Sequence, residues 1–284
     1  MTTSTITSVP SVEFWPPVVE PKVGGLFPQV IWPAEEAVTN ADLSNVVQPN
    51  PDRFIIGGVH VRTINYGGQN SSGVWDAPWC GAPTPSNATL NGSRPAFPAP
   101  FEAIHCWAFD SCDETEQSRD YVRLNAQRWL EQNEQNDVET SFAARMLTDA
   151  GTPQTSTSFL DALGKLEVAI GNTNLPGFIH ISPYLAPFAV SHFSVLGNQP
   201  TGEGVLKTWL ESVLIFGSGY SGSLGMTMIA TSQVYGWRGA MSVTDAMYAP
   251  EDGTVTENQF VAVAERSYAL GYEKLIAAVT VTLP

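Results

Sequence analysis

The chain has 284 residues, 43% of them hydrophobic, and its 28 acidic residues against 13 basic ones give a net charge of −15. This length and apolar content suffice for one large domain, or two closely joined ones, with a substantial core. The acidic balance excludes a protein that grips DNA or RNA through a basic surface. No apolar run of about 18 residues is present and the N-terminus lacks a signal-peptide pattern, so we expect no membrane span and synthesis in a cytoplasm.

Residues 1–52 are dense in proline and also carry large apolar side chains, among them Phe14, Trp15 and Trp32. Proline at this density excludes long helices and central strands. The apolar side chains are too numerous for a solvated linker. The segment therefore predicts an extended arm that lies on another surface, in its own subunit or in a neighbour.

Residues 53–65 alternate as a strand does, and residues 66–92 follow with many glycine, asparagine and serine residues. This stretch begins at Tyr66 and contains Trp75 and Trp79, so it predicts a long hairpin-like excursion with an apolar tip. A hairpin alone is marginally stable in water and needs a surface to lie on. Exposed tryptophans on such an excursion indicate contacts with a partner.

Residues 101–150 contain no glycine and no proline, which predicts a long helix. Ser111 to Glu114 has the spacing of a capping box, and Gly151 is a suitable stop. Residues 131–137 are polar on every side and separate two apolar stripes. We therefore expect the middle of this helix to cross open surface rather than a core.

The rest of the chain predicts a compact α/β unit followed by a β-rich tail, and hence an α+β fold. Amphipathic spacing indicates a second helix over 158–170, and proline in a first turn indicates a third over 183–193. Residues 177–182 read as a buried strand. Further strands are expected within 205–216, 226–248 and 257–283.

Residues 217–222 read Gly-Ser-Gly-Tyr-Ser-Gly, the spacing of a dinucleotide-binding loop. The motif needs a helix after it, and the chain continues instead with β-branched and aromatic residues, so we expect a β-to-β connection and no cofactor. The four histidines and the cysteines Cys80, Cys106 and Cys112 lack metal-ligand spacing, which predicts no metal site. His180 alternates within an apolar strand and is expected to be a core or interface residue. No catalytic set converges.

The order of elements resembles the major capsid proteins of tailed bacteriophages with the Hong Kong 97-like fold, particularly those of actinobacterial phages. Segments 177–186 and 213–222 are similar to axial-domain segments of that family, and 258–272 resembles its closing peripheral strand, with Glu265 and Arg266 at the charged positions. The domains that the resemblance implies are an N-terminal arm over 1–52, an extended loop over 53–100, a peripheral domain with a spine helix over 101–155, an axial domain over 156–238, and return strands of the peripheral domain over 239–284.

The resemblance implies a non-enzymatic major capsid protein that assembles into hexamers and pentamers of an icosahedral head. The head would enclose double-stranded DNA without sequence-specific binding, so the protein would be found in the virion. Expected partners are other copies of the chain, a separate scaffolding protein, a portal and, as a further candidate, a decoration protein. The extended loop has no lysine, which predicts no lysine cross-link there. The side chains expected to contact neighbouring subunits are Phe14, Trp15, Trp32, Tyr66, Trp75, Trp79 and Tyr220.

Two alternatives stay open at this point. An encapsulin-like compartment shares the capsid fold and would hold a cargo enzyme instead of DNA. A soluble acidic enzyme would place its site near His180 and the Gly217 loop, and would lose activity on His180→Ala.

Overall fold

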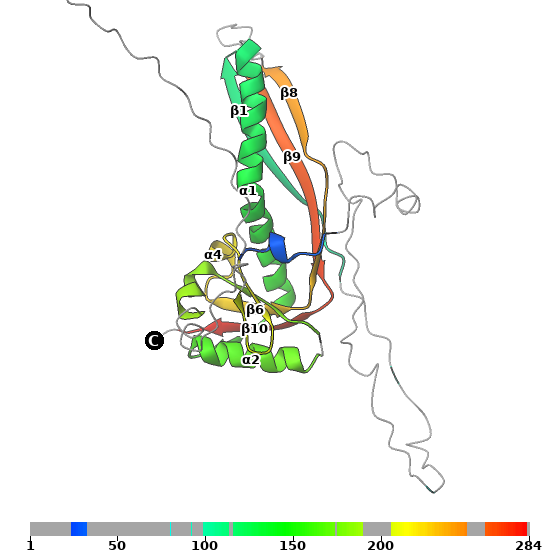
Figure 1. Cartoon of the computed structure of the whole chain (residues 1–284), viewed down its shortest axis with the longest axis vertical. Coiled ribbons are helices and arrows are strands. Elements are labelled where there is room, and N and C mark those ends of the chain that lie inside the picture. Colours follow the sequence, from blue (N-terminus) through cyan, green and yellow to red (C-terminus); the bar gives the residue numbers. More distant parts are fainter. Residues whose placement is uncertain are drawn as a thin grey trace, which may run out of the picture.

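The computed structural model describes residues 24–32, 80, 92, 99–113, 116–173, 175–189, 206–248 and 259–282. Helix α1 (Glu116–Ala150) has 35 residues, about 52 Å at 1.5 Å per residue, and forms the long axis of the molecule. Two sheets pack against it, one along its length and one near its C-terminal end (Figure 1). Five of the predicted contact residues lie outside the described part of the chain: Phe14, Trp15, Tyr66, Trp75 and Trp79.

The first sheet is long, antiparallel and narrow. Its central strand is β9 (Gln259–Tyr272), flanked on one side by β1 (Ile104–Asp113) and paired elsewhere with β7 (Val234–Arg238) and β8 (Ser242–Tyr248). Alternate residues of β9 turn toward α1 and are buried, as strand geometry requires. The helix therefore covers one face of this long sheet.

The second sheet is mixed and compact, with the strand order β2-β10-β6-β3-β5-β4. The strands are β2 (Gln154–Ser156), β10 (Leu275–Val281), β6 (Thr227–Thr231), β3 (Phe178–Ile181), β5 (Val213–Phe216) and β4 (Leu206–Lys207). Its pairs are parallel for β2 with β10 and for β3 with β5, and antiparallel elsewhere.

Both faces of the compact sheet are covered, which explains why all four residues of β3 are buried. Ile179 joins the cluster of buried residues that includes α2 (Phe159–Gly171), whereas its neighbour Phe178 joins the cluster around α1. Ser158 caps α2 by accepting a hydrogen bond from the backbone N–H of Asp161, so the predicted helix and its start are confirmed. The fold is α+β, as the sequence predicts.

Two strand connections pass between the sheets at one place. The chain leaves the compact sheet between β6 and β7 and returns to it between β9 and β10. The buried Ser232 hydroxyl accepts hydrogen bonds from the backbone N–H groups of Glu273 at 3.0 Å and Lys274 at 3.1 Å, and the Ser232 N–H donates to the Lys274 carbonyl at 2.9 Å. The two crossings are therefore tied together.

The predicted start of the long helix is wrong. Ser111 lies in strand β1, and α1 begins at Glu116, so the apparent capping box over 111–114 does not cap it. Strand β1 pairs with β9 along ten residues, from Ile104 opposite Tyr268 to Asp113 opposite Gln259. This pairing with a segment about 150 residues away decides the local structure.

The tail predicted as return strands, 239–284, is divided between the two sheets. Strands β8 and β9 belong to the long sheet, but β10 pairs with β6 and β2 in the compact one. Strand β7, which falls within the predicted axial domain over 156–238, pairs with β9 in the long sheet.

Two short helices complete the described fold. The loop after β5 contains one helical turn, α4 (Tyr220–Ser223), and η4 (Pro183–Leu185) begins the predicted third helix. No helix in the described residues is long and apolar enough to cross a membrane.

Candidate functional site

The polar middle of α1, residues 131–137, is mostly exposed, as the sequence predicts, but Glu134 and Gln135 within it and Glu139 just after it are buried. Glu139 has no exposed surface, and its carboxylate accepts four hydrogen bonds from three segments. Oε1 accepts from the backbone N–H of Leu26 at 2.9 Å and from Gln135 Nε2 at 2.8 Å. Oε2 accepts from the backbone N–H of Gly219 at 2.9 Å and from Ser218 Oγ at 3.2 Å. We call this group of five residues the Glu139 junction.

The glycines around the junction allow two chain segments to approach α1 closely. A Cβ on Gly219 would lie 2.3 Å from the backbone oxygen of Asn136, and one on Gly25 would lie 2.0 Å from Gln135 Nε2. The Asn136 oxygen is backbone and cannot move aside cheaply, so only glycine fits at position 219. Within the glycine pattern at 217–222, Gly219 therefore serves close packing, in agreement with a structural interpretation of this loop, whereas Gly222 meets no described atom within 4 Å.

Residues 24–32 connect the two sheets. The Phe216 N–H at the end of β5 donates to the Gly24 carbonyl at 2.8 Å, while Ile31 forms a parallel bridge with Tyr235 of β7. Between these points, η1 (Phe27–Gln29) buries Phe27 against Tyr268. This part of the predicted arm thus lies on its own subunit and spans both halves of the fold.

A second buried acid of α1 is paired with a charge. Arg266 Nη1 contacts both carboxylate oxygens of Glu134 at 2.9 Å, and the side chains are 17% and 11% exposed. Burial raises the pKa of Glu134, a rise that Tyr268 and Arg266 oppose. Cys106 packs nearby, and burial raises the pKa of its thiol to about 12, so it stays protonated and unreactive.

His180 is completely buried in the core of the compact sheet, as one sequence interpretation predicts. Its Nδ1 lies 2.9 Å from Tyr220 Oη and its Nε2 lies 2.9 Å from Thr231 Oγ1. Because Thr231 Oγ1 already donates its proton to the Ser232 carbonyl, it accepts from Nε2–H, and Tyr220 donates to Nδ1. Burial lowers the pKa of His180 to about 3, so the ring is neutral.

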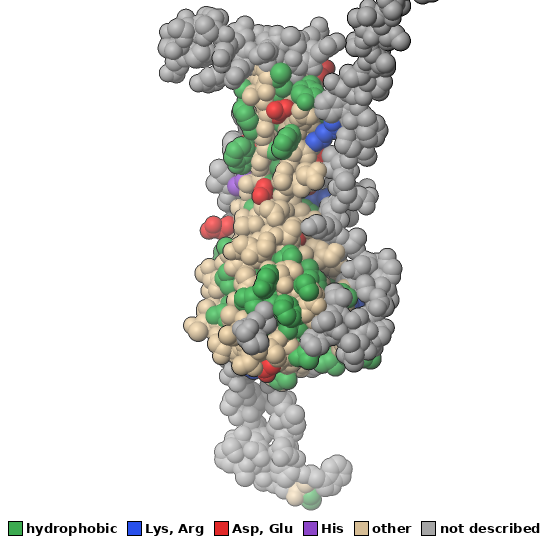
Figure 2. All heavy atoms as spheres, turned by 90° about the vertical axis from the view of Figure 1, so that its left-hand side faces the viewer, with side chains coloured by type: hydrophobic (Ala, Val, Ile, Leu, Met, Phe, Trp, Pro, Cys, Tyr) green, Lys and Arg blue, Asp and Glu red, His purple; other side chains and the backbone are tan. Residues whose placement is uncertain are grey.

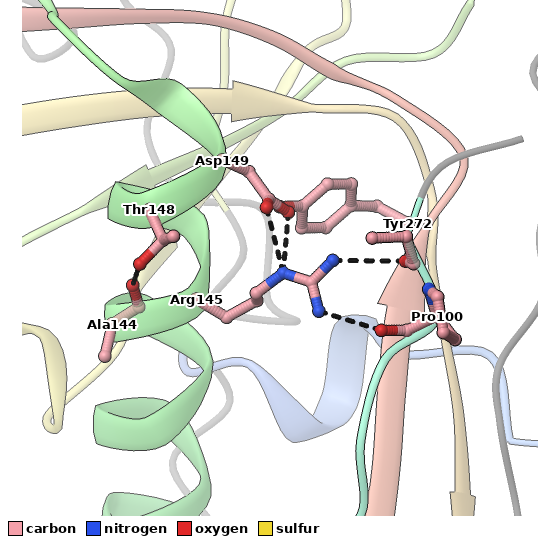
Figure 3. Close-up of polar contacts among 7 residues, drawn as sticks. Pro100, Ala144, Arg145, Thr148, Asp149 and Tyr272 are labelled. Carbon is pink, nitrogen blue, oxygen red and sulfur yellow. Dashed lines mark hydrogen bonds and ion pairs between the residues drawn. The ribbon is translucent and has the colours of Figure 1, made fainter. Parts of the chain in front are cut away.

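Arg145, near the C-terminal end of α1, holds the chain where it re-enters the described fold (Figure 3). Its guanidinium donates to the carbonyls of Pro100 at 3.0 Å and Ala99 at 3.1 Å, and it pairs with Asp149 at 2.9 Å. The guanidinium carbon also lies 4.3 Å from the ring centroid of Phe101. Tyr272 donates to Asp149 from the other side. The end of the predicted extended loop is therefore fixed to α1.

The surface carries large apolar side chains on several separate elements. Figure 2 shows hydrophobic side chains over both the long upper part and the rounded lower part of one face. Trp107 on β1, Trp129 on α1 and Trp209 after β4 are 65%, 59% and 66% exposed. The other exposed side chains of this kind include Phe109, Leu124, Leu160, Val168, Tyr184 and Leu210.

The two described members of the predicted contact set behave differently. Trp32 is half-buried, packs on the core and donates from Nε1 to the Phe27 carbonyl at 3.1 Å. Tyr220 is fully buried in its own chain and bonded to His180, so a contact with another subunit is a wrong prediction for it. The sequence also missed the exposed side chains of Trp107, Trp129 and Trp209, because each has at least one apolar neighbour and no local pattern marks it as exposed.

The described residues contain no group of three or more His, Cys, Asp or Glu side chains placed to hold a metal ion. Cys106 and Cys112 are free thiols, buried and half-buried, as expected of small hydrophobes, whereas Cys80 is an exposed free thiol.

No protein-family model matches the chain, and no curated protein matches it by sequence. Among solved structures, one of Mycobacterium phage Che8 is similar, with 12% identity and a TM-score of 0.47 over 99% of this chain and 98% of the other. A virus-like particle from Pyrococcus furiosus is similar with 12% identity and a TM-score of 0.44, over 68% of this chain and 81% of the other. The capsid of cyanophage P-SCSP1u is similar with 12% identity and a TM-score of 0.39, over 84% of this chain and 89% of the other. At these values no residue's role is carried over from the matched proteins.

Proposed function

We propose that the chain is the major capsid protein of a tailed bacteriophage, which assembles into hexamers and pentamers of an icosahedral head around double-stranded DNA. The observation that carries this proposal is the spread of exposed tryptophan side chains over three elements, at Trp107, Trp129 and Trp209. Tryptophan is enriched in protein interfaces and among the residues that contribute most to binding. A shell subunit meets neighbours on several sides and needs an interface on each.

The two tethered segments support the same proposal. The Glu139 junction fixes the chain at Leu26, and Arg145 fixes it at Ala99 and Pro100. The first point lies in the middle of the segment that resembles the arm, and the second at the end of the segment that resembles the extended loop. Rigid anchoring at its base reduces the entropy that a segment loses when it reaches a neighbouring subunit.

The position of His180 weakens the alternative that the chain is a soluble enzyme. An enzyme site there would need a substrate to reach a side chain with no exposed surface, both of whose ring nitrogens are hydrogen-bonded. The other alternative, an encapsulin-like shell, is distinguished from a phage head by what it contains. A phage head contains DNA and depends on a scaffolding protein and a portal, whereas a compartment contains a cargo protein.

The test is negative-stain electron microscopy with light scattering on the purified chain, alone and after expression with its neighbouring genes. We expect closed shells or capsomer rings, and particles that package DNA when the neighbouring genes include a portal and a terminase. A chain that stays monomeric under both conditions would overturn the proposal. Particles that hold a cargo enzyme in place of DNA would favour the compartment.

A further inference from the structure

The turn between β4 and β5 presents two adjacent large apolar side chains to solvent. Trp209 and Leu210 are 66% and 70% exposed. They lie between Lys207 and Glu211, both exposed as well, so an apolar tip is flanked by one charge of each sign. An exposed tryptophan in a turn is typical of a residue that anchors an interface.

The turn is held rigidly. The backbone N–H of Thr208 donates to the Ser212 carbonyl at 2.9 Å, and the Ser212 N–H donates back to Thr208 Oγ1 at 3.1 Å. Ser212 Oγ donates to Glu167 Oε2 of α2 at 3.0 Å. Glu211 has a φ of +66°, a left-handed conformation that a non-glycine residue adopts at a cost. These hydrogen bonds stabilise the turn in this conformation, so its backbone loses little conformational entropy when it binds a partner.

The outer face of α2 is apolar where a surface helix is normally charged. Leu160 and Val168 are 50% and 67% exposed and lie eight residues apart, with the exposed Gly164 midway on the same side of the helix. A Cβ on Gly164 would meet no atom of the described residues within 4 Å. Glycine in a helix interior is unfavourable relative to alanine, and packing within this chain does not require it here.

We propose that the Lys207–Glu211 turn of one copy of the chain docks on the outer face of α2 of a second copy, with Trp209 and Leu210 placed over Gly164 between Leu160 and Val168. The proposal rests on the proposed function, since it names one contact by which subunits join. The exposed surface of α2 and the tip of the turn are the two partners in this contact.

Charge argues for a second copy as the occupant. Beside its apolar line, α2 carries the pair Asp161 and Lys165, joined at 2.7 Å and both partly exposed. A docked turn brings Lys207 toward Asp161 and Glu211 toward Lys165, so both rim charges meet an opposite sign. Two copies with a net charge of −15 repel each other, which favours contact through faces that are apolar or of balanced charge.

The geometry of the contact suits a ring. The turn and α2 are different segments of one chain, so a contact repeated head-to-tail from copy to copy closes into a ring when the rotation between copies permits. Within one copy the Ser212–Glu167 bond already fixes the turn relative to α2, yet Trp209 and Val168 both stay exposed. The two surfaces are therefore not satisfied by each other within the chain.

The first test uses a substitution that leaves the fold intact. Gly164→Leu fills open space on a helix and is expected to leave the unfolding temperature of the unassembled chain unchanged or higher, while the assembled fraction falls at least roughly tenfold by light scattering. The matched control is Gly222→Leu, which also adds a side chain at an exposed glycine with no atom within 4 Å. Normal assembly of Gly164→Leu, or equal loss in both variants, would overturn the proposal.

The second test detects the contact directly. Chains carrying Leu210→Cys and chains carrying Gly164→Cys, both with the exposed Cys80 replaced by serine, are assembled as a mixture and oxidised gently. We expect a disulfide-linked dimer that contains one chain of each kind. Normal particles without this dimer would refute the contact and leave the proposed function standing. Parent chains that never assemble would instead refute the proposed function, and the contact with it.

Discussion

Glu139 is a buried acid that forms no ion pair with the described residues, so its hydrogen bonds must offset the cost of removing its charge from water. Two of the donors are backbone N–H groups, of Leu26 and Gly219, which have no other acceptor in the structure as described. A carboxylate has two acceptor oxygens and no donor, so it accepts hydrogen bonds from both sides at once. The residue therefore joins the N-terminal segment and the loop after β5 to the middle of α1.

We expect Glu139→Ala to lower the free energy of unfolding by about 2 to 5 kcal/mol, because it leaves two buried N–H groups unpaired and creates a cavity. Urea unfolding of the unassembled chain measures this change. Glu131→Ala, at an exposed acid on the same helix, is the control and should change stability by less than about 0.5 kcal/mol. Equal effects of the two substitutions would show that the junction contributes little.

His180 makes stability depend on pH. Its pKa is lowered from 6.5 to about 3 by burial, so the unfolded chain binds a proton between these values and the folded chain does not. The stabilisation is complete above pH 6.5 and is lost as the pH falls. From pH 7.5 to pH 4.5 we expect this residue to cost about 2 to 3 kcal/mol of unfolding free energy.

The variant His180→Gln isolates this effect, because an amide can accept from Tyr220 and donate to Thr231 without titrating. Urea unfolding of parent and variant at both pH values gives the difference. The variant is expected to lose about 2 to 3 kcal/mol less than the parent on acidification. If both lose the same amount, His180 does not control the acid sensitivity of the fold.

At the scale of elements, the loop between β5 and β6 contains two glycines that differ in the space around them. Gly219→Ala places a Cβ 2.3 Å from the Asn136 carbonyl oxygen, which is backbone and cannot move aside cheaply. We expect it to separate the loop from α1 and destabilise the chain by about 2 kcal/mol or more. Gly222→Ala in the same loop meets nothing within 4 Å and should be neutral or slightly stabilising. Thermal unfolding of the pair checks this, and a milder effect at Gly219 than at Gly222 would contradict it.

Local patterns predicted the elements that local chemistry decides. Helix α2 is predictable because Ser158 caps its own N-terminus and one apolar stripe packs on the core. Strand β3 is predictable because it is buried on both faces and is therefore mostly apolar. The end of strand β1, residues 111–113, was predicted as the start of the long helix, because the stability of this strand comes from its pairing with β9, far along the chain. The burial of Glu139 could not be predicted, because the donors that surround its carboxylate come from residues 26 and 219 and no local pattern places them there.

At the scale of the molecule, two distant stretches of chain hold the sheets in a fixed relation. Ser232 ties the two strand crossings, and residues 24–32 span from β5 to β7. Helix α1 contributes buried residues to packing against both sheets, among them Val122 and Phe142. The subunit is thus expected to move as one body when it joins its neighbours, so that surfaces on both sheets reach their partners together.

Net charge sets how assembly should respond to salt. Subunits with a net charge of −15 repel one another, and the repulsion is screened over about 30 Å at 0.01 M salt but only about 8 Å at 0.15 M. Contacts through apolar side chains such as Trp107, Trp129 and Trp209 are not weakened by this screening. We therefore expect the assembled fraction of the purified chain to rise with sodium chloride between about 0.01 and 0.5 M. Light scattering follows the change, and tetramethylammonium chloride at equal ionic strength should act equally, because screening does not depend on the cation. Assembly that weakens as salt rises would mean that ion pairs, rather than apolar anchors, hold the subunits together.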